Sequence, residues 1–260
     1  MTDPAPIQID RDLPEAILAD APAAAVAALV RASGGVWLRG RPEDFPRAPD
    51  GTPNGAPEGW SAGDDRRAIP TDPAQGQVIV AEAEGQAGLV CRTGLHGGMV
   101  LTDLAPGRAI TLAVVWHPHR TEPARTLLCL NPSAAGGAYL FLSHGEDGFN
   151  LKDTAEQAVL TVPDARRDGA PARMLVVSAG PSGLALWQDG GSVVRAPAEM
   201  DPLPARADLF IGCRSQRRGL AKTLGASLIR EVIVLPGQQA LSDESGPALA
   251  ALGAHFRWGL

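Results

Sequence analysis

The sequence has little positive charge and no long apolar run. Its 23 lysines and arginines are outnumbered by 29 aspartates and glutamates, which gives a formal net charge of −6. A non-specific nucleic-acid binder needs a positive field to attract phosphates, so this charge argues against that function. A transmembrane helix needs about eighteen consecutive apolar residues, and the lack of such a run predicts no membrane insertion.

Cysteine is scarce, and the number of cysteines is odd. Cys91, Cys129 and Cys213 are widely spaced, and each stands beside apolar, strand-like residues. This pattern predicts buried reduced thiols and not a disulfide or metal framework. Residues 1–12 carry acids where a secretory signal carries basic residues, and no apolar stretch follows at once. We therefore expect synthesis in a cytoplasm without a signal peptide.

Short motifs that mark common enzymes are also missing. Walker A, GxSxG, HExxH and CxxC patterns do not occur. No catalytic class is therefore indicated by a local motif.

The part of the chain from Val78 onward contains many short β-branched and apolar runs. Turn signals such as Pro106-Gly107, Asn131-Pro132 and Asp189-Gly190 separate them, and the last is favoured in two-residue hairpins. Many short strands with regular turns predict a mainly β fold, either an antiparallel β-sandwich or a jelly roll.

Two segments precede this β-rich part. Residues 1–39 contain a helical pattern from about Pro14 to Ala32, with a break or restart expected at Pro22, and a brief strand at Val36–Leu38. The helix could pack on the main domain or dock on a partner. Residues 40–75 are rich in proline and glycine and predict an arm or linker, although Phe45 and Trp60 are apolar anchors. Residues 76–260 form the third predicted segment.

Several motifs resemble the concanavalin A-like lectin/glucanase superfamily, especially its laminin-G-like members. The closing motifs are Leu209–Gly212 (LFIG), Ile229–Val234 (IREVIV) and the tail Ala240–Leu252, in which Ser242 is expected to cap a helix that includes Asp243 and Glu244. Earlier motifs in the same order are Ile110–Pro118 (ITLAVVWHP) and Leu184–Gly190 (LALWQDG). The resemblance covers roughly Gln75 to Leu260 and implies a concanavalin A-like jelly roll.

The glucanases of this superfamily carry two glutamates around an aspartate on one strand, spaced E-x-D-x-E or E-x-D-x-x-E. Alternate positions of a strand face one side, so this spacing directs the carboxylates into one cleft. The spacing is absent here: Glu82 and Glu84 are two residues apart, but the next acid is Asp103. The resemblance therefore implies a protein without catalysis, and a hydrolase with unrecognised residues stays open as an alternative.

Sugar recognition remains as the expected chemistry, because aromatic rings stack on sugars and planar polar groups bind their hydroxyls. Aromatic residues are only 4% of the chain, so each exposed one matters; Tyr139 and Phe141 alternate on one face of a predicted strand. A basic loop near residue 215 suits an anionic sugar, carboxylate or phosphate. The candidate ligand-binding residues are Arg214, Gln216, Arg217, Arg218, Lys222, Trp116, Trp187 and Asn150. The alternatives are a solvated loop and core packing of the rings.

Metal binding has weaker support in the sequence. His117 and His119 lie on the same side of an extended chain, and Asp147 and Asp153 could supply oxygen ligands to calcium, as acidic loops of some laminin-G-like domains do. The alternative is a set of polar loop residues. No cofactor is expected to be required.

The resemblance and the expected compartment together suggest a carbohydrate-binding domain of a phage-like spike or fibre, similar to the head spikes of gene transfer agents. Such a protein would be anchored in an oligomer or larger assembly through residues 1–39. It would bind a cell-surface or capsular polysaccharide as part of a released particle. The alternative from another class is a structural sandwich that only contacts proteins.

Overall fold

The computed structural model describes most of the chain. The described residues are 15–46, 57–63, 65–72, 74, 79–83, 86–133, 139–153, 159–164, 172–196, 203–216, 221–242 and 246–258, with side chains for all of these except 15–20, 79–83, 86 and 258.

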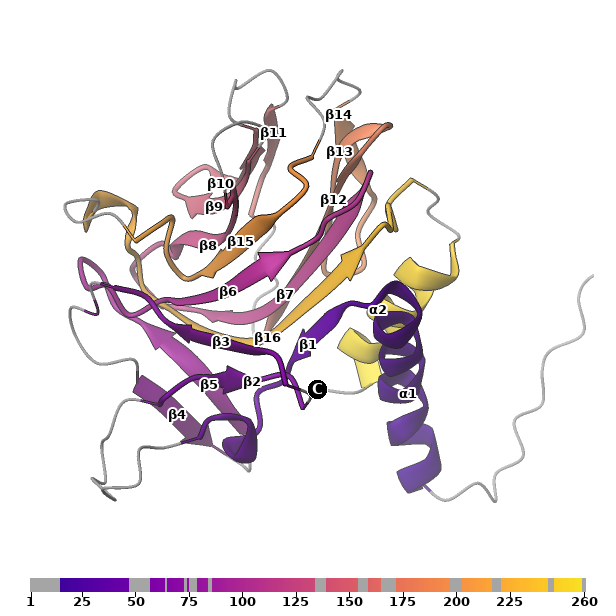
Figure 1. Ribbon diagram of the computed structural model, residues 1–260, viewed down its shortest axis with the longest axis horizontal. Helices are drawn as coiled ribbons and strands as arrows, with labels where there is room; N and C mark the ends of the chain where they lie inside the picture. Colours follow the sequence, from indigo (N-terminus) through magenta and orange to yellow (C-terminus); the bar gives the residue numbers. More distant parts are fainter. Residues whose placement is uncertain are drawn as a thin grey trace, which may run out of the picture.

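Two antiparallel sheets face each other, which confirms the predicted β-sandwich (Figure 1). We call the first the covered sheet; its order is β14 (Val194–Ala196), β13 (Gly183–Gln188), β12 (Arg173–Gly180), β7 (Ile110–Pro118), β16 (Ser227–Pro236), β5 (Gln86–Cys91) and β4 (Ile79–Ala83), and β1 (Val36–Leu38) also pairs with β16. We call the second the open sheet; its order is β11 (Val159–Val162), β10 (Gly148–Lys152), β9 (Leu140–Gly145), β8 (Arg125–Pro132), β15 (Ala207–Ile211), β6 (Met99–Leu104), β3 (Arg67–Pro70) and β2 (Trp60–Ser61).

The burial of side chains differs clearly between β12 of the covered sheet and β10 of the open sheet. Every residue of β12 is buried, whereas β10 in the open sheet alternates between buried and partly exposed positions. Alternation is typical of a strand with one face toward water, and a continuous apolar run is typical of a strand that is covered on both faces. The central strands β12, β7 and β16 of the covered sheet are therefore buried on both sides, whereas its edge strand β14 is mostly exposed.

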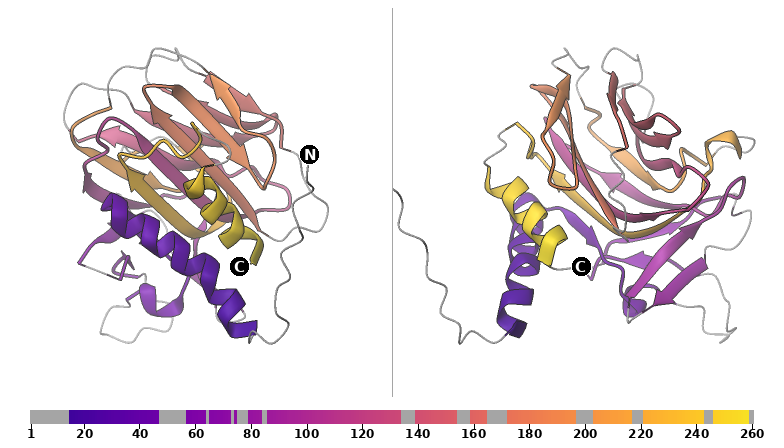
Figure 2. Two further views of the ribbon diagram at one scale, coloured as in Figure 1. Left: turned by 90° about the vertical axis from the view of Figure 1, so that its right-hand side faces the viewer. Right: turned by 180° about the vertical axis from the view of Figure 1, so that it is seen from behind.

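Two helices provide the second cover. α1 (Glu15–Ser33) packs against β16 and against α2 (Pro247–Trp258), and both lie on the outer side of the covered sheet (Figures 1 and 2). Between helices and sheet lies an apolar cluster that includes Val26, Trp37 and Leu252. No helix in the described part of the chain is long and apolar enough to span a membrane.

The predicted helix over Pro14–Ala32 agrees with α1 to within one residue at each end. The expected break at Pro22 is wrong, because one helix continues through this proline. Proline removes one backbone donor, but the packing of α1 on α2 and β16 overrides this local cost.

The C-terminal helix begins later than predicted. α2 starts at Pro247, which suits a first helical position because proline has no amide hydrogen to leave unpaired there. Ser242 does not cap the helix; its hydroxyl donates to the Gln239 carbonyl at 2.8 Å. Asp243 and Glu244 lie outside the described residues.

The segment predicted as an arm contributes to the sandwich where it is described. Phe45, which follows the 3-10 helix η1 (Pro42–Asp44), stacks on Trp60 at 4.9 Å, and both rings are buried in the core. Trp60 Nε1 donates to the Arg39 carbonyl at 2.7 Å. β3 pairs with β6. The division into segments 1–39, 40–75 and 76–260 stays a prediction.

One buried carboxylate joins α2 and β1 to the covered sheet. Glu231 Oε2 accepts hydrogen bonds from Trp37 Nε1 at 3.1 Å and from His255 Nε2 at 2.8 Å, and all three side chains are buried. Glu231 follows a bulge between Ile229 and Glu231, where β16 loses its regular register with β7. The bulge turns this glutamate toward the helices in an otherwise apolar strand.

We expect Glu231→Ala to lower the free energy of unfolding by about 2–3 kcal/mol, because two buried N–H groups lose their acceptor. Glu231→Gln keeps one acceptor oxygen and should cost less. In a Trp37→Phe background the cost of Glu231→Ala should shrink, since one of the donors is already gone. Urea unfolding of the four variants measures this, and equal costs in both backgrounds would show that Glu231 and Trp37 do not interact.

Candidate functional site

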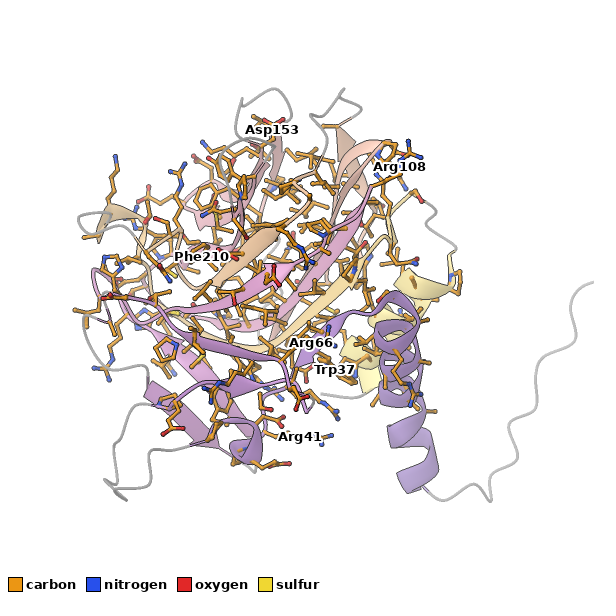
Figure 3. The ribbon with its side chains drawn as sticks, viewed as in Figure 1. Trp37, Arg41, Arg66, Arg108, Asp153 and Phe210 are labelled. Carbon is orange, nitrogen blue, oxygen red and sulfur yellow. The ribbon has the colours of Figure 1, made fainter. Side chains whose placement is uncertain are left out.

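The outer face of the open sheet carries a continuous row of side chains. The strand registers place each member directly opposite the next, across β3, β6, β15, β8, β9, β10 and β11. The row consists of Ile69, Val100, Phe210, Cys129, Phe141, Lys152 and Val159. Its two ends, Ile69 and Val159, are 39% and 47% exposed, whereas its central members are buried. The central members, Val100, Phe210, Cys129 and Phe141, form an apolar cluster with Cys213 and Leu224. Figure 3 shows Phe210 on the part of the molecule remote from the helices, whereas Trp37 lies beside them.

Polar side chains flank this row on both sides. On one side Asp208 is paired in register with Asn131, which lies near Tyr139 at the start of β9. On the other side Asn150 pairs in register with Ser143 and Thr161, and Thr161 Oγ1 donates to Asn150 Oδ1 at 2.8 Å. The face therefore has a buried apolar centre, with hydroxyl, amide and carboxylate groups around it.

Arg214 lies over the two aromatic rings of this face. Its guanidinium carbon is 4.9 Å from the centre of the Phe141 ring and 5.5 Å from the centre of the Tyr139 ring. Its Nη2 donates to the Tyr139 hydroxyl at 2.6 Å. A cation over an aromatic face is attracted by the negative face of the ring. The rings thus fix the position of the guanidinium.

Hydrogen bonds from β8 fix the backbone at Arg214. Asn131 Nδ2 donates to the Arg214 carbonyl at 2.9 Å, and Cys129 Sγ donates to Asn131 Oδ1 at 3.2 Å. Cys129 and Asn131 both belong to β8, so the central strand of the open sheet positions the loop. The Arg214 loop is therefore already in place before a ligand binds, and β8 does not have to move.

Arg214 is partly buried, and none of the carboxylates that the structure describes neutralises it. In the described part of the chain no carboxylate lies within ion-pair distance of its guanidinium. The neighbouring Asp208 uses Oδ1 to accept from Ser133 Oγ at 2.8 Å and from the Asp103 amide at 3.1 Å. A guanidinium in such a place is suited to a carboxylate, sulfate or phosphate from outside.

The predicted residues of the basic loop are only partly described. Gln216 and Lys222 are exposed, and Lys222 belongs to the 3-10 helix η2 (Ala221–Thr223). Arg217 and Arg218 lie outside the described residues. Arg214 and Asn150 occupy one sheet face, as described above, with Phe141 between them.

Trp116 is not a sugar-stacking residue, which corrects the prediction. Its ring is 0% exposed and packs edge-to-face against Phe149 at 6.0 Å and against His144 at 5.1 Å. β7 is the central strand of the covered sheet, and Trp116 points from it into the core between the sheets. Both faces of this strand are buried, so the sequence did not reveal which way the ring points.

Trp187 lies on the opposite sheet from Arg214. Its ring is buried with the apolar cluster under the helices, and it borders a groove beside α2. The structure therefore does not bring Trp187 together with the basic loop.

The four predicted metal ligands do not converge. Asp147 and Asp153 flank β10 at its two ends, about 20 Å apart for an extended strand. His117 Nε2 faces Arg230 at 3.4 Å, and His119 Nδ1 accepts from the Thr121 amide at 3.4 Å. Among the described residues no three histidine, cysteine, aspartate or glutamate side chains form a group that could hold a metal. Calcium stays a prediction.

A buried charged network inside the sandwich was not predicted from the sequence. Arg173 donates through Nε to Asp189 at 2.5 Å and through Nη1 to Asp164 at 2.7 Å, and His144 Nε2 contacts Asp164 at 3.3 Å. Burial lowers the pKa of Arg173, but the hydrogen bonds that it donates to the two aspartates, together with their negative charges, outweigh this effect and the net shift is upward.

All four carboxylate oxygens of this network are engaged. The second oxygen of Asp189 accepts from the Met174 amide at 2.6 Å. Since His144 Nδ1 accepts from the Ala124 amide at 3.2 Å, its proton lies on Nε2 and points at Asp164. Arg173 and His144 belong to different sheets, so the network clamps the two sheets together. We therefore assign it a structural role.

Comparison with known proteins shows that this chain is similar in fold to several solved structures. No family model and no curated protein sequence matches the chain. A GH54 α-L-arabinofuranosidase soaked with a cyclic sulfate inhibitor superposes with a TM-score of 0.50 at 12% identity, over 75% of this chain and 50% of that one. The Trypanosoma rangeli sialidase in complex with 2,3-difluorosialic acid superposes with a TM-score of 0.51 at 12% identity, over 85% of this chain and 32% of that one.

A third similar structure is domain 4 of AbnA, a GH43 extracellular arabinanase from Geobacillus stearothermophilus, in complex with arabinotriose. Its TM-score is 0.47 at 14% identity, and the match covers 82% of this chain and 87% of that domain. The chain spans half the length of the arabinofuranosidase and about a third of the sialidase. At these identities the comparisons establish the sandwich fold and leave the function to be argued from the site.

The prediction of buried reduced thiols is confirmed, because Cys91, Cys129 and Cys213 are all free and buried. Burial raises the pKa of the Cys129 thiol to about 12, against a smaller opposing effect of the Arg214 guanidinium. Burial also raises the pKa of Cys91 to about 12 and raises that of Cys213. A thiol held in this protonated form is a poor nucleophile.

We therefore expect no reaction with Ellman's reagent at pH 8 while the protein is folded, and three equivalents after denaturation. The ordinary thiol pKa is 9.0, so above pH 9 the unfolded chain loses thiol protons that the folded chain keeps up to about pH 12. The free energy of unfolding should fall as pH rises through this window. The free energy of unfolding should fall less steeply with pH in Cys129→Ala than in the unmodified protein. Equal slopes in the two proteins would contradict the raised pKa of the Cys129 thiol.

Proposed function

We propose that this protein binds an anionic carbohydrate on the outer face of the open sheet and does so without catalysis. The observation that carries the proposal is Arg214: a partly buried guanidinium, fixed over two rings, with no carboxylate partner in the described part of the chain. A carboxylate or sulfate on a sugar would supply the missing counter-charge through charge-assisted hydrogen bonds.

The groups around Arg214 support a sugar over a simple anion. Tyr139 is partly exposed, so a pyranose that reaches the guanidinium can also contact its ring or its hydroxyl. Beyond Phe141, the polar row of Ser143, Asn150 and Thr161 supplies hydroxyl and amide groups for sugar hydroxyls. The ligand would run across the strands, because these groups are aligned by register.

The surroundings of the face are consistent with a long ligand. α1 and α2 lie on the other sheet, so neither of these helices covers this face (Figure 2). The segment after η2 does pack on it, because Leu224 belongs to the same apolar cluster as Phe210 and Phe141. The arabinofuranosidase and the sialidase with similar folds are named for the sugars on which they act. That likeness supports sugar binding as a use of this fold, and the residues of the open sheet supply the specific argument.

The biological setting that we propose is the one predicted from the sequence. A receptor-binding domain of a phage-like particle would meet a capsular or other cell-surface polysaccharide after release. Anionic capsules fit a site that is built around an arginine with no carboxylate partner among the described residues. Binding to host-type cells with and without capsule tests this setting separately from the chemistry of the site.

We expect the protein to bind polygalacturonate (carboxylated) and to show no measurable affinity for neutral dextran. Arg214→Gln should weaken binding to polygalacturonate at least about tenfold, because the charge-assisted contact is lost. Affinity electrophoresis or calorimetry at constant salt measures the change, and circular dichroism checks folding.

The matched control is Arg108→Gln, which removes the same charge from an exposed turn far from Phe210 (Figure 3). Equal losses in the two variants would mean that only net charge matters. A protein that binds no polysaccharide, but has a fixed oligomeric state or protein partner, would favour the structural sandwich instead. Turnover of the polysaccharide would favour a hydrolase.

A further inference from the structure

A groove on the opposite side of the sandwich lies between α2 and the turn that connects β13 and β14. Its volume is about 240 Å³, and its principal lining residues are Trp187, Gly190, Gly191, Leu249, Gly253 and Arg257. The groove belongs to the covered sheet and its helix, whereas Arg214 belongs to the open sheet. It is therefore separate from the site proposed above.

The helix wall of the groove has an apolar end and a cationic end. Leu249, Gly253 and Arg257 are spaced four residues apart, so they lie along one side of α2. Gly253 is the gap in this wall: a Cβ atom there would lie 3.7 Å from Trp187 Cζ2. Because glycine has no side chain, the edge of the indole borders the open space, and Trp187 is 5% exposed.

The opposite wall is a rigid turn with little side-chain bulk. Asp189 and Gly190 both have positive φ, at 48° and 85°, and the Gly191 amide donates to the Gln188 carbonyl at 2.8 Å. The Asp189 carboxylate is turned inward, where Arg173 and the Met174 amide engage it. The two glycines therefore expose their backbone to the groove. The Asp189 carboxylate points away from the groove and contributes no negative charge to it.

Arg257 gives the groove its charge. The side chain is exposed in the last turn of α2, and no carboxylate in the described part of the chain lies within ion-pair distance of it. An exposed arginine alone would be unremarkable. Here it stands at the end of a preformed groove with an indole edge, a leucine and two glycine backbones.

We propose that this groove binds one pyranose ring that carries a carboxylate, as in a hexuronic acid. The volume is below the roughly 300–1,000 Å³ of sites for drug-sized ligands, so it fits a single ring. The C–H face of the sugar would contact Trp187 and Leu249, its hydroxyls would bond to the Gly190–Gly191 backbone, and its carboxylate would pair with Arg257. The assignment does not depend on the proposed role of Arg214.

The test uses the full chain with Arg214→Gln, so that any response comes from the groove and not from the open sheet. Glucuronate is titrated to about 20 mM, with indole fluorescence and ligand-observed NMR as readouts, and glucose is the neutral comparator. We expect saturable binding in the millimolar range, as for a single small ring, and no saturation with glucose.

Two variants address the two ends of the groove. Gly253→Leu fills the space beside Trp187 with a good helix former, and Arg257→Gln removes the guanidinium; each should weaken glucuronate binding at least about tenfold. The control is Arg31→Gln, which removes an exposed arginine from the last turn of the neighbouring helix and should change nothing. If Gly253→Leu does not fold, Gly253→Ala makes the smaller change at the same point.

Absence of saturable binding overturns the proposal, and so does binding that is unchanged in both Gly253→Leu and Arg257→Gln. Equal affinity for glucose and glucuronate overturns the role of the carboxylate. Failure at the groove leaves the Arg214 site untouched, because polygalacturonate binding is measured in the chain that retains Arg214.

Discussion

The burial of both faces of the covered sheet is the constraint on which the rest of the structure depends. Its central strands β7, β12 and β16 pack on the open sheet with one face and under α1 and α2 with the other. Such strands must be apolar at nearly every position, and they leave no surface for a ligand. Among the described residues, a ligand could therefore bind at the outer face of the open sheet, at the loops, or at the border between α2 and the covered sheet.

Within the open sheet, the register of the strands brings the residues of the candidate site together. Phe210, Cys129 and Phe141 are adjacent because β15 pairs with β8 and β8 pairs with β9. Cys129 then holds Asn131, and Asn131 holds the carbonyl of Arg214. The loop after β15 is thus positioned by the strand beside it. A small shift in the register of β8 would separate the guanidinium from both rings.

The sequence was sufficient for the features that rest on local pattern. The sandwich, the extent of α1, the strand at Val36–Leu38 and the buried thiols follow from periodicity, turn residues and apolar neighbours. It was insufficient where contacts are distant. The direction of Trp116 is hidden because its strand has no polar side, and the Arg173 network joins residues whose pairing depends on two sheets meeting. Asp208 and Asn131 gave no signal beyond being polar at alternate strand positions.

A comparison of Arg173 with Arg214 shows why Arg214 is the better candidate for binding an anion. Both guanidinium groups are removed from bulk water to some extent, which costs free energy unless hydrogen bonds and opposite charge replace the lost hydration. Arg173 receives this compensation in full from two aspartates, so nothing remains for a ligand to supply. Among the described residues, Arg214 receives two ring faces and one phenol hydroxyl. An incoming anion would therefore gain more from Arg214 than from a fully hydrated surface arginine, because part of the cost of desolvation is already present in the folded protein.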